Sequence, residues 1–234
     1  MNSRQPLAII TGGGRGIGKG ISIRLASEGY RILLTYNSDS FSAEETVDKI
    51  RSNGSDAVAL KVDCSVPSEI LLLSEHPWCK GGIDALILNH GAYDRIPASE
   101  LMDEVLRKSM EINFFGAFGV WNSVKEYLVQ KASIVAIGSQ LGIRGSPHGA
   151  DYSASKAALH AWARSLAQDV GASGKTFVSN CFGYPIFNAD KEVIKIYKKS
   201  RKCFNQLKKK FPNNINRFPI KKSQIKKILN QKNI

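Results

Sequence analysis

The chain has 234 residues, of which 43% are hydrophobic, so it is long enough for one large domain with a substantial core. Its formal charge of +13 comes from 33 Lys and Arg against 20 Asp and Glu. Residues 1–189 hold 18 of each sign, whereas residues 190–234 hold 15 basic and 2 acidic side chains. This distribution argues against a basic binding surface spread over the whole chain. We predict a charge-neutral domain over 1–189 and a basic, partly helical tail over 190–234.

The sequence indicates neither a metal site nor a membrane segment. Its cysteines have no short CxxC spacing, and no two histidines lie three to five residues apart, as a zinc site would require. We therefore predict no metal ligands, and we expect reduced thiols in a cytoplasmic protein. No run approaches about 18 apolar residues and no apolar leader precedes the first strand, so we expect neither a membrane span nor a signal peptide.

Short apolar runs alternate with longer amphipathic stretches, which is typical of an α/β fold. The apolar runs predict strands at 7–11, 30–36, 57–62, 85–88, 133–137 and 176–182. The amphipathic stretches predict helices at 16–28, 42–53, 100–130 and 152–170. Parallel strands joined by helices, with a glycine turn after the first strand, predict a single doubly wound parallel sheet of the Rossmann-like type. Its ligand is expected at the carboxyl ends of the strands.

A glycine-rich turn follows the first predicted strand and reads TGGGRGIG at residues 11–18. Such a turn lets the backbone approach a pyrophosphate and points the N–H groups of a helix N-terminus at it, which a Cβ would obstruct. A simple tight turn is the alternative, but the position between a strand and a helix favours a dinucleotide site. The turn residues predicted to bind the cofactor are Gly12, Arg15, Gly16, Ile17 and Gly18.

The end of the second predicted strand indicates which dinucleotide is bound. A carboxylate there would bind the ribose hydroxyls of NAD and repel the extra phosphate of NADP. The chain instead has Asn37 and Ser38, with no acid before Asp39, and it has Arg15 in the glycine turn. We therefore predict that these residues favour NADP(H) over NAD(H). The alternative interpretation is that Arg15 is a solvated loop residue.

A tyrosine and a lysine four residues apart, Tyr152 and Lys156, open the last long helix of the predicted domain. Positions four apart lie on one helix face, and a tyrosine with an ordinary pKa of about 10 needs a nearby positive charge to exchange protons near neutral pH. We predict that Tyr152 donates the proton during hydride transfer to a carbonyl and that Lys156 lowers its pKa and holds the nicotinamide ribose. Ser139, after a strand, is predicted to bind the substrate oxygen. His90 and His148 lack an Asp partner and are interpreted as loop residues.

Over residues 5 to about 183, the chain resembles short-chain dehydrogenase/reductases of the shorter, single-domain type. The resemblance rests on the glycine turn and on the motifs and single residues Asp63, LNHG at 88–91, Asn113, Ser139 and Tyr152 to Lys156. It implies that Asp63 contacts the adenine, and that Asn89 lies beside the adenosine and braces the central strand. It further implies that Asn113 holds a proton-relay water linked to Lys156, and that Tyr152 and Lys156 also bind the cofactor.

The resemblance weakens after the sixth strand, where the chain reads GYPIFN at 183–188. The family usually has a threonine there that contacts the nicotinamide amide, and backbone groups near Ile186 are expected to take its place. Beyond Asp190 no pattern matches the lid helix and seventh strand of the family, so we expect six strands. Three interpretations of the tail remain: a solvated helix over the sheet edge, a contact surface for an acidic partner such as an acyl-carrier protein, nucleic acid or anionic lipid, and a degenerate or frame-shifted end.

These features predict an NADP-preferring oxidoreductase that transfers a hydride between the nicotinamide and a carbonyl or secondary alcohol carbon of a small molecule. The sequence at 35–38 and 43–45 is similar to that of 3-oxoacyl-carrier-protein reductases, which implies a 3-oxoacyl thioester as substrate. The alternative is a catalytically impaired nucleotide-binding regulatory or polyanion-binding protein on the same fold. The resemblance also implies a homodimer or higher homo-oligomer formed through the helices at 100–130 and 152–170.

Overall fold

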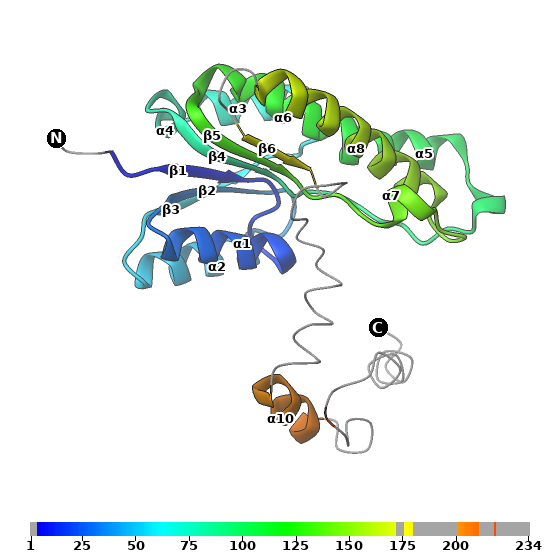
Figure 1. Ribbon diagram of the computed structural model, residues 1–234, viewed down its shortest axis with the longest axis horizontal. Coiled ribbons are helices and arrows are strands. Elements are labelled where there is room, and N and C mark those ends of the chain that lie inside the picture. Colours follow the sequence, from blue (N-terminus) through cyan, green and yellow to red (C-terminus); the bar gives the residue numbers. More distant parts are fainter. Residues whose placement is uncertain (1–3, 172–175, 180–200, 211–217, 219–234) are drawn as a thin grey trace. The chain divides into compact units, whose positions relative to one another are not determined.

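The computed structural model describes residues 4–171, 176–179, 201–210 and 218. The chain divides into two compact units, residues 1–184 and 185–234. In the first unit, six parallel strands form one sheet in the order β3-β2-β1-β4-β5-β6 (Figure 1). The prediction of an α/β fold with a doubly wound parallel sheet is confirmed.

The strands and helices of the first unit alternate along the chain. The strands are β1 (Leu7–Ile10), β2 (Arg31–Tyr36), β3 (Ala57–Lys61), β4 (Ile83–Leu88), β5 (Leu128–Ala136) and β6 (Thr176–Ser179). The helices are α1 (Gly16–Ser27), α2 (Ser40–Ser52), α3 (Pro67–Glu75), α4 (Pro77–Lys80), α5 (Asp103–Met110), α6 (Gly116–Val124), α7 (Leu141–Arg144) and α8 (Ala150–Gly171). A π-helical turn, η2 (Glu111–Phe115), joins α5 to α6, and single 3₁₀ turns are η1 (Ala98–Glu100) and η3 (Lys125–Tyr127).

Several stretches differ from the sequence-based expectation, among them the regions of helix α3 and strand β5. Helix α3 stands between β3 and β4, where the sequence predicts no helix, and Pro67 occupies its first turn, where a missing N–H breaks no helical hydrogen bond. Strand β5 begins at Leu128 instead of residue 133, and the helix before it ends at Val124. The exposed side chains of Gln130 and Lys131 interrupt the apolar pattern of this strand, and that is why the sequence places its start too late.

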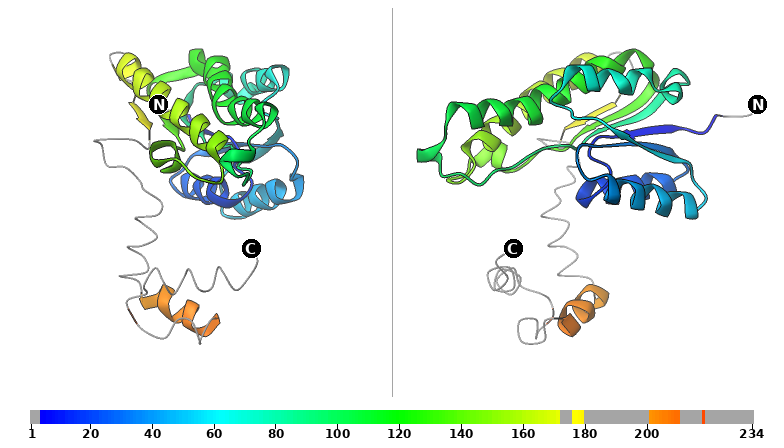
Figure 2. Two further views of the ribbon diagram at one scale, coloured as in Figure 1. Left: turned by 90° about the vertical axis from the view of Figure 1, so that its right-hand side faces the viewer. Right: turned by 180° about the vertical axis from the view of Figure 1, so that it is seen from behind.

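Both faces of the sheet are buried, which explains the continuous apolar runs of its central strands. Helices α1 and α2 cover one face, and α3, α6 and α8 cover the other (Figures 1 and 2). Because successive side chains of a strand point to opposite faces, Leu7 and Ile9 of β1 enter the core with α3, α6 and α8, whereas Ala8 and Ile10 enter the core with α1 and α2. All four side chains are fully buried.

The sheet places a crevice at the carboxyl ends of β1 and β4. Strand β1 lies between β2 and β4, so the chain leaves β1 toward one edge of the sheet and later crosses back to continue on the other side of β1. In open α/β sheets, ligands bind outside the carboxyl ends of the strands where the strand order reverses in this way. The glycine turn at residues 11–18 and the loop that begins at Asn89 leave the sheet at this point.

In the second unit, the structure describes helix α10 (Arg201–Lys210) and residue 218. Phe204 of α10 is buried, its ring centroid lies 5.6 Å from that of Phe218, and the Arg201 guanidinium lies 4.8 Å from the Phe218 ring centroid. The tail over 190–234, which the sequence predicts to be partly helical, therefore contains helix α10. The other residues of the tail except residue 218, and Ile186 before it, lie outside the described residues. Among the described helices, none is long and apolar enough to cross a membrane.

Candidate active site

The glycine turn after β1 has a backbone that only glycine adopts readily. Gly12 and Gly16 have φ values of +62° and +55°, in the left-handed region. A Cβ on Gly18 would lie 2.1 Å from the carbonyl oxygen of Gly12, so the start of α1 packs directly on the turn. The turn is further fixed to β2, because Gly12 N donates a 3.1 Å hydrogen bond to Thr35 Oγ1. This close packing leaves an open cradle at the N-terminus of α1, where a pyrophosphate fits.

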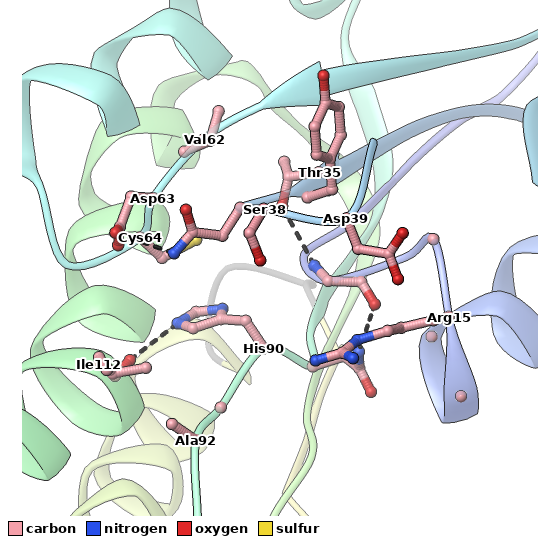
Figure 3. Close-up of a pocket in the computed structure, with 18 of the residues that line it drawn as sticks. Arg15, Thr35, Ser38, Asp39, Val62, Asp63, Cys64, His90, Ala92 and Ile112 are labelled. Atoms are coloured by element: carbon pink, nitrogen blue, oxygen red, sulfur yellow. Dashed lines mark hydrogen bonds between the residues drawn. The ribbon is translucent and has the colours of Figure 1, made fainter. Parts of the chain in front are cut away.

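A cavity of about 440 Å³ opens in front of this turn, which lies within the usual size range of small-molecule sites. Figure 3 shows Arg15 and Asp39 at one end of the cavity and Asp63 and Cys64 at the other. The sequence-predicted cofactor residues that line it are Gly12, Arg15, Gly16, Ile17, Gly18, Asn37, Ser38, Asp63 and Asn89. Tyr152 and Lys156 do not line it, and Ile186 lies outside the described residues.

Asn89 holds the glycine turn against β4. Its Nδ2 donates to the carbonyl oxygens of Thr11 and Gly12, at 3.0 and 3.1 Å, and its backbone N–H donates to Thr11 Oγ1 at 2.9 Å. The Asn89 side chain therefore binds the first two residues of the turn, Thr11 and Gly12. The geometry suits a brace between the two central strands.

Asn37 and Asp63 meet at the far end of the cavity. Asn37 Nδ2 donates to Asp63 Oδ2 at 2.9 Å, and the Ser65 hydroxyl donates to Asp63 Oδ1 at 2.6 Å. Burial alone would raise the pKa of Asp63, but the hydrogen bonds from Ser65 and Asn37 outweigh it and hold the pKa below its usual value. Asp63 therefore remains a carboxylate at neutral pH and can accept a hydrogen bond from an amino group of a ligand.

Asp39 also lines the cavity, although no sequence motif marks it as a site residue. It caps α2, because its carboxylate accepts a 3.0 Å hydrogen bond from Ser42 N. Hydrogen bonds from Ser42 lower the pKa of Asp39, and the positive charge of Arg15 adds to this effect. The cavity thus presents one guanidinium and one carboxylate beside Ser38, at the place where the cofactor ribose is expected.

His90 lies at the centre of the site, and both of its ring nitrogens have partners. Nδ1 is 2.7 Å from Thr11 Oγ1, and Nε2 is 3.1 Å from the carbonyl oxygen of Ile112. Figure 3 marks the second of these contacts with a dashed line. Burial lowers the pKa of His90 to about 4, and the charge of Lys156 contributes. The ring is therefore neutral, with Nε2 donating to Ile112, and it connects two loops instead of acting as a base.

The four residues predicted to be catalytic come from three elements. Tyr152 and Lys156 lie on α8, Ser139 follows β5, and Asn113 lies in the π-helical turn η2. Ser139 lies close enough to Tyr152 for its hydroxyl to lower the pKa of the tyrosine. Lys156 Nζ donates a 2.9 Å hydrogen bond to the carbonyl oxygen of Ile137 and lies 5.8 Å from the centroid of the Tyr152 ring. The fold therefore brings Ser139, Tyr152 and Lys156 together.

Asn113 is tied to the helix that carries Tyr152. Its Nδ2 lies 3.0 Å from the Ala92 carbonyl oxygen and 3.0 Å from Ser155 Oγ, and its Oδ1 accepts from Ala92 N at 2.8 Å. Ser155 Oγ in turn donates to the carbonyl oxygen of Tyr152 at 2.8 Å. A π-turn shifts the helical register locally and is frequent at functional sites. Here it places a buried amide between the loop after β4 and α8.

The pKa values of the tyrosine and the lysine move in directions set mainly by burial. Burial raises the pKa of Tyr152 above its usual value, the hydrogen bond from Ser139 opposes this shift, and Tyr93 adds to it. Burial lowers the pKa of Lys156 to about 8. The sequence predicts that Lys156 lowers the pKa of Tyr152, whereas in the structure the ammonium binds the Ile137 carbonyl and burial of the phenol has the largest effect on its pKa.

Tyr93 is a second aromatic residue at the site that sequence reasoning missed. Its ring packs on the Tyr152 ring with 4.6 Å between centroids and 33° between planes, and its hydroxyl donates to the His148 carbonyl oxygen at 2.5 Å. Gly149 makes room for it: its φ is +127°, and a Cβ there would lie 2.3 Å from the Tyr93 ring. No local motif marks this contact, because Tyr93 and Gly149 lie on different loops.

Residues 6–186 match the protein family described as short chain dehydrogenase. The chain belongs to the short-chain dehydrogenase/reductase family. Its curated relatives include the hydroxynaphthalene reductase-like protein Arp2 of Metarhizium acridum, which is 36% identical over 167 residues, 70% of this chain and 62% of that protein. Elsinochrome reductase 1 of Elsinoe fawcettii is 32% identical over 177 residues, 75% of this chain and 66% of that protein. The chain thus spans only 62% to 66% of the length of these two relatives.

Two solved structures share the fold of the described residues. A dehydrogenase/reductase from Sinorhizobium meliloti 1021 is 34% identical, with a TM-score of 0.71 over 74% of this chain and 70% of that one. A short chain dehydrogenase from Burkholderia cenocepacia J2315, solved in complex with NADP, is 28% identical, with a TM-score of 0.71 over 83% of this chain and 82% of that one. Family members bind NAD(P), and the cradle at the glycine turn fits such a dinucleotide.

Two glycines of the same helix test the role of the close packing at the turn. A Cβ at Gly18 meets the Gly12 carbonyl oxygen, whereas a Cβ at Gly20 meets nothing within 4 Å. We expect Gly18→Ala to displace the turn and weaken NADPH binding by about tenfold or more. Gly20→Ala should bind NADPH normally and gain about 0.5–1 kcal/mol in unfolding free energy. Fluorescence titration and urea denaturation measure both effects, and equal NADPH affinity of the two variants would contradict the assignment of the cradle.

The lowered pKa of Lys156 predicts a pH-dependent stability difference between the chain and its Lys156→Met variant. The folded state favours the neutral amine, so the lysine costs stability fully below pH 8 and progressively less as the pH rises toward 10.5. Between pH 7 and pH 10 the unfolding free energy of the natural chain should therefore rise by about 2.5 kcal/mol relative to Lys156→Met. Urea denaturation at both pH values measures this difference, and parallel pH dependence of the two chains would refute it.

Proposed function

We propose that the chain is an NADP-preferring oxidoreductase that transfers a hydride between the nicotinamide and a carbonyl or secondary alcohol carbon. The observation that carries the proposal is the cluster of Ser139, Tyr152 and Lys156: the Lys156 ammonium lies 5.8 Å from the Tyr152 ring centroid, and Ser139 lies close enough to Tyr152 to lower its pKa. This cluster lies at the carboxyl edge of the sheet that also holds the glycine cradle. The bound dinucleotide would supply or accept the hydride, and the chain supplies the proton.

The proposed proton donor is Tyr152. Its raised pKa keeps the phenol protonated at neutral pH, so it can give a proton to the oxygen of a carbonyl under reduction. Ser139 hydrogen-bonds the same substrate oxygen and stabilises the phenolate that remains after proton transfer. Lys156 supplies a buried cation within reach of that phenolate, and Asn113 orients the helix segment that carries Tyr152 through Ser155.

Replacing the proposed proton donor tests the function directly. Tyr152→Phe removes the hydroxyl and keeps the ring, so NADPH oxidation with a carbonyl substrate should fall by about 10²-fold or more, while NADPH affinity changes little. Tyr127→Phe, on the turn before β5, is the matched control and should keep full activity. The measurement is the steady-state rate of NADPH oxidation beside a fluorescence titration of the cofactor. Undiminished turnover by Tyr152→Phe would exclude the proposed role.

The residues beside the ribose end of the cavity support NADP over NAD. Arg15 supplies a positive charge, and Ser38 supplies a hydroxyl donor without a negative charge. Asn37 is also uncharged, and its amide binds Asp63. Asp39 is the opposing group, but its carboxylate is engaged by Ser42 at the start of α2 and is close enough to Arg15 to be influenced by its charge. The relative from Burkholderia cenocepacia that was solved with NADP is consistent with this preference.

The cofactor preference is tested by comparing dissociation constants for NADPH and NADH. We expect NADPH to bind about tenfold more tightly or better, because a charge-assisted hydrogen bond from a guanidinium to a phosphate is worth about 1.5–3 kcal/mol. Arg15→Ala should weaken NADPH binding and leave NADH binding nearly unchanged, whereas Asp39→Asn should not weaken NADPH binding. Tighter binding of NADH by the natural chain would overturn the assignment.

Two substrate classes are favoured by different observations. The sequence at the end of β2 and the start of α2 supports a 3-oxoacyl thioester. The names of the curated relatives, hydroxynaphthalene reductase-like protein and elsinochrome reductase, favour an aromatic ketone or phenolic substrate. The half-exposed ring of Tyr93 beside Tyr152 agrees with the second class, because it offers a flat surface for stacking. A panel with both classes distinguishes them, and NADPH binding without any turnover would instead support a nucleotide-binding regulatory protein.

The same proposal includes a homodimer formed through the helices that follow β4 and β5. The exposed aromatic side chains Phe115 and Phe118 lie at η2 and α6, and Phe118 packs edge-on against Trp162 of α8 with 6.0 Å between ring centroids. Large apolar side chains that cluster on a surface mark contact sites more often than scattered ones do. The exposed basic residues of α10, Arg201, Lys208 and Lys209, support a separate contact between the tail and an acidic partner.

A further inference from the structure

Two side chains of helix α8 hydrogen-bond the backbone just after β5. One belongs to the Tyr152 to Lys156 motif, and the other does not. Lys156 Nζ donates to the carbonyl oxygen of Ile137 at 2.9 Å. One turn further along the helix, His160 Nε2 accepts a 3.1 Å hydrogen bond from the backbone N–H of Ser139. Tyr152, Lys156 and His160 follow at intervals of four residues, so they lie along one face of α8.

The His160 ring is packed into a fixed position. Its side chain is buried, with 3% of its surface exposed. Gly138, the residue before Ser139, lies against the ring so closely that a Cβ there would be 2.0 Å from His160 Nε2. The absence of a side chain at position 138 therefore permits the hydrogen bond, and the close contact leaves the ring little room to turn away from Ser139.

The protonation state of His160 suits an acceptor. An imidazole nitrogen accepts a hydrogen bond only when it carries no proton. Burial lowers the pKa of His160 to about 4, and the positive charges of Lys156 and Arg164 contribute. The ring is therefore neutral across the physiological range, with Nε2 unprotonated toward Ser139 and the proton on Nδ1.

We propose that His160 is a positioning residue that fixes the backbone of Ser139, so that the Ser139 hydroxyl stays beside that of Tyr152. The inference rests on the proposed function, in which these two hydroxyls act on one substrate oxygen. Ser139 is fixed by its backbone N–H to His160, while its Oγ accepts from Leu141 N at 3.1 Å. Because His160 and Tyr152 lie on the same helix, we infer that the distance between the two hydroxyls is set by α8 as well as by the loop after β5.

Two substitutions separate the acceptor from simple packing. In His160→Gln, the side-chain amide can place an acceptor near the position of Nε2, whereas His160→Met has similar bulk and no comparable acceptor. We expect His160→Met to lower kcat by about 10- to 100-fold, because small displacements of catalytic groups cost rates of this size. His160→Gln should recover kcat to within a few-fold of the natural chain. Both variants should bind NADPH normally, which also shows that they are folded.

A double-mutant comparison shows whether His160 acts through Ser139. If it does, His160→Met should lower kcat little further in a chain that already carries Ser139→Ala, because the hydroxyl that it positions has been removed. Losses that multiply in the double variant would overturn the proposal. Equal kcat for His160→Met and the natural chain would overturn it as well.

Amide hydrogen exchange at Ser139 tests the hydrogen bond from the Ser139 N–H to His160, here called the clamp, without relying on turnover. NMR-detected exchange of this N–H should be faster in His160→Met than in the natural chain and slow again in His160→Gln. A natural chain that binds NADPH but reduces no carbonyl would refute the proposed function, and protected exchange at Ser139 would still establish the clamp. Unchanged exchange in His160→Met would refute the clamp whatever the activity.

Discussion

The hydroxyl of Thr11 is the junction on which the rest of the site depends. At the end of β1 it accepts hydrogen bonds from the backbone N–H groups of Asn89 and His90, at 2.9 and 3.2 Å, and it lies 2.7 Å from His90 Nδ1. His90 Nε2 in turn hydrogen-bonds the carbonyl oxygen of Ile112. The next residue, Asn113, hydrogen-bonds Ser155 on α8. A chain of short contacts therefore joins the nucleotide cradle to the helix of the proposed proton donor. The cofactor end and the chemical end of the site are parts of one rigid network.

A buried cation organises the electrostatics of this network. Lys156 is almost fully buried, and its charge lowers the pKa of both His90 and His160, in addition to the larger effect of burial. Both imidazoles are therefore neutral, and each accepts or donates in one fixed direction: His90 donates to Ile112, and His160 accepts from Ser139. The histidines at this site thus serve as connectors between backbone segments, and the groups left for proton transfer are Tyr152, Ser139 and Lys156.

The sequence predicts the parts of the site that follow local rules and misses those that depend on tertiary contact. Apolar runs identify β1, β2 and β4, and spacing along a helix identifies Tyr152 with Lys156, because both patterns lie within a few residues. His160 and Tyr93 escape notice because their partners are backbone atoms 21 and 55 residues away. The sequence does not identify Asp39 as a cavity residue, because its position before α2 is already explained by its role as the helix N-cap. The direction of the Tyr152 pKa shift was mispredicted for a similar reason: the extent of burial is a property of the assembled fold.

The raised pKa of Tyr152 bears on the direction of the proposed reaction. Reduction of a carbonyl needs a proton donor, which the neutral phenol is, whereas oxidation of an alcohol needs a phenolate as base. Burial and the nearby Tyr93 ring favour the phenol, and the Ser139 hydrogen bond only partly offsets them. Lys156 stays bound to the Ile137 carbonyl instead of contacting the phenol oxygen directly. At neutral pH the neutral phenol therefore suits the proton-donor role that the proposed reduction of a carbonyl requires.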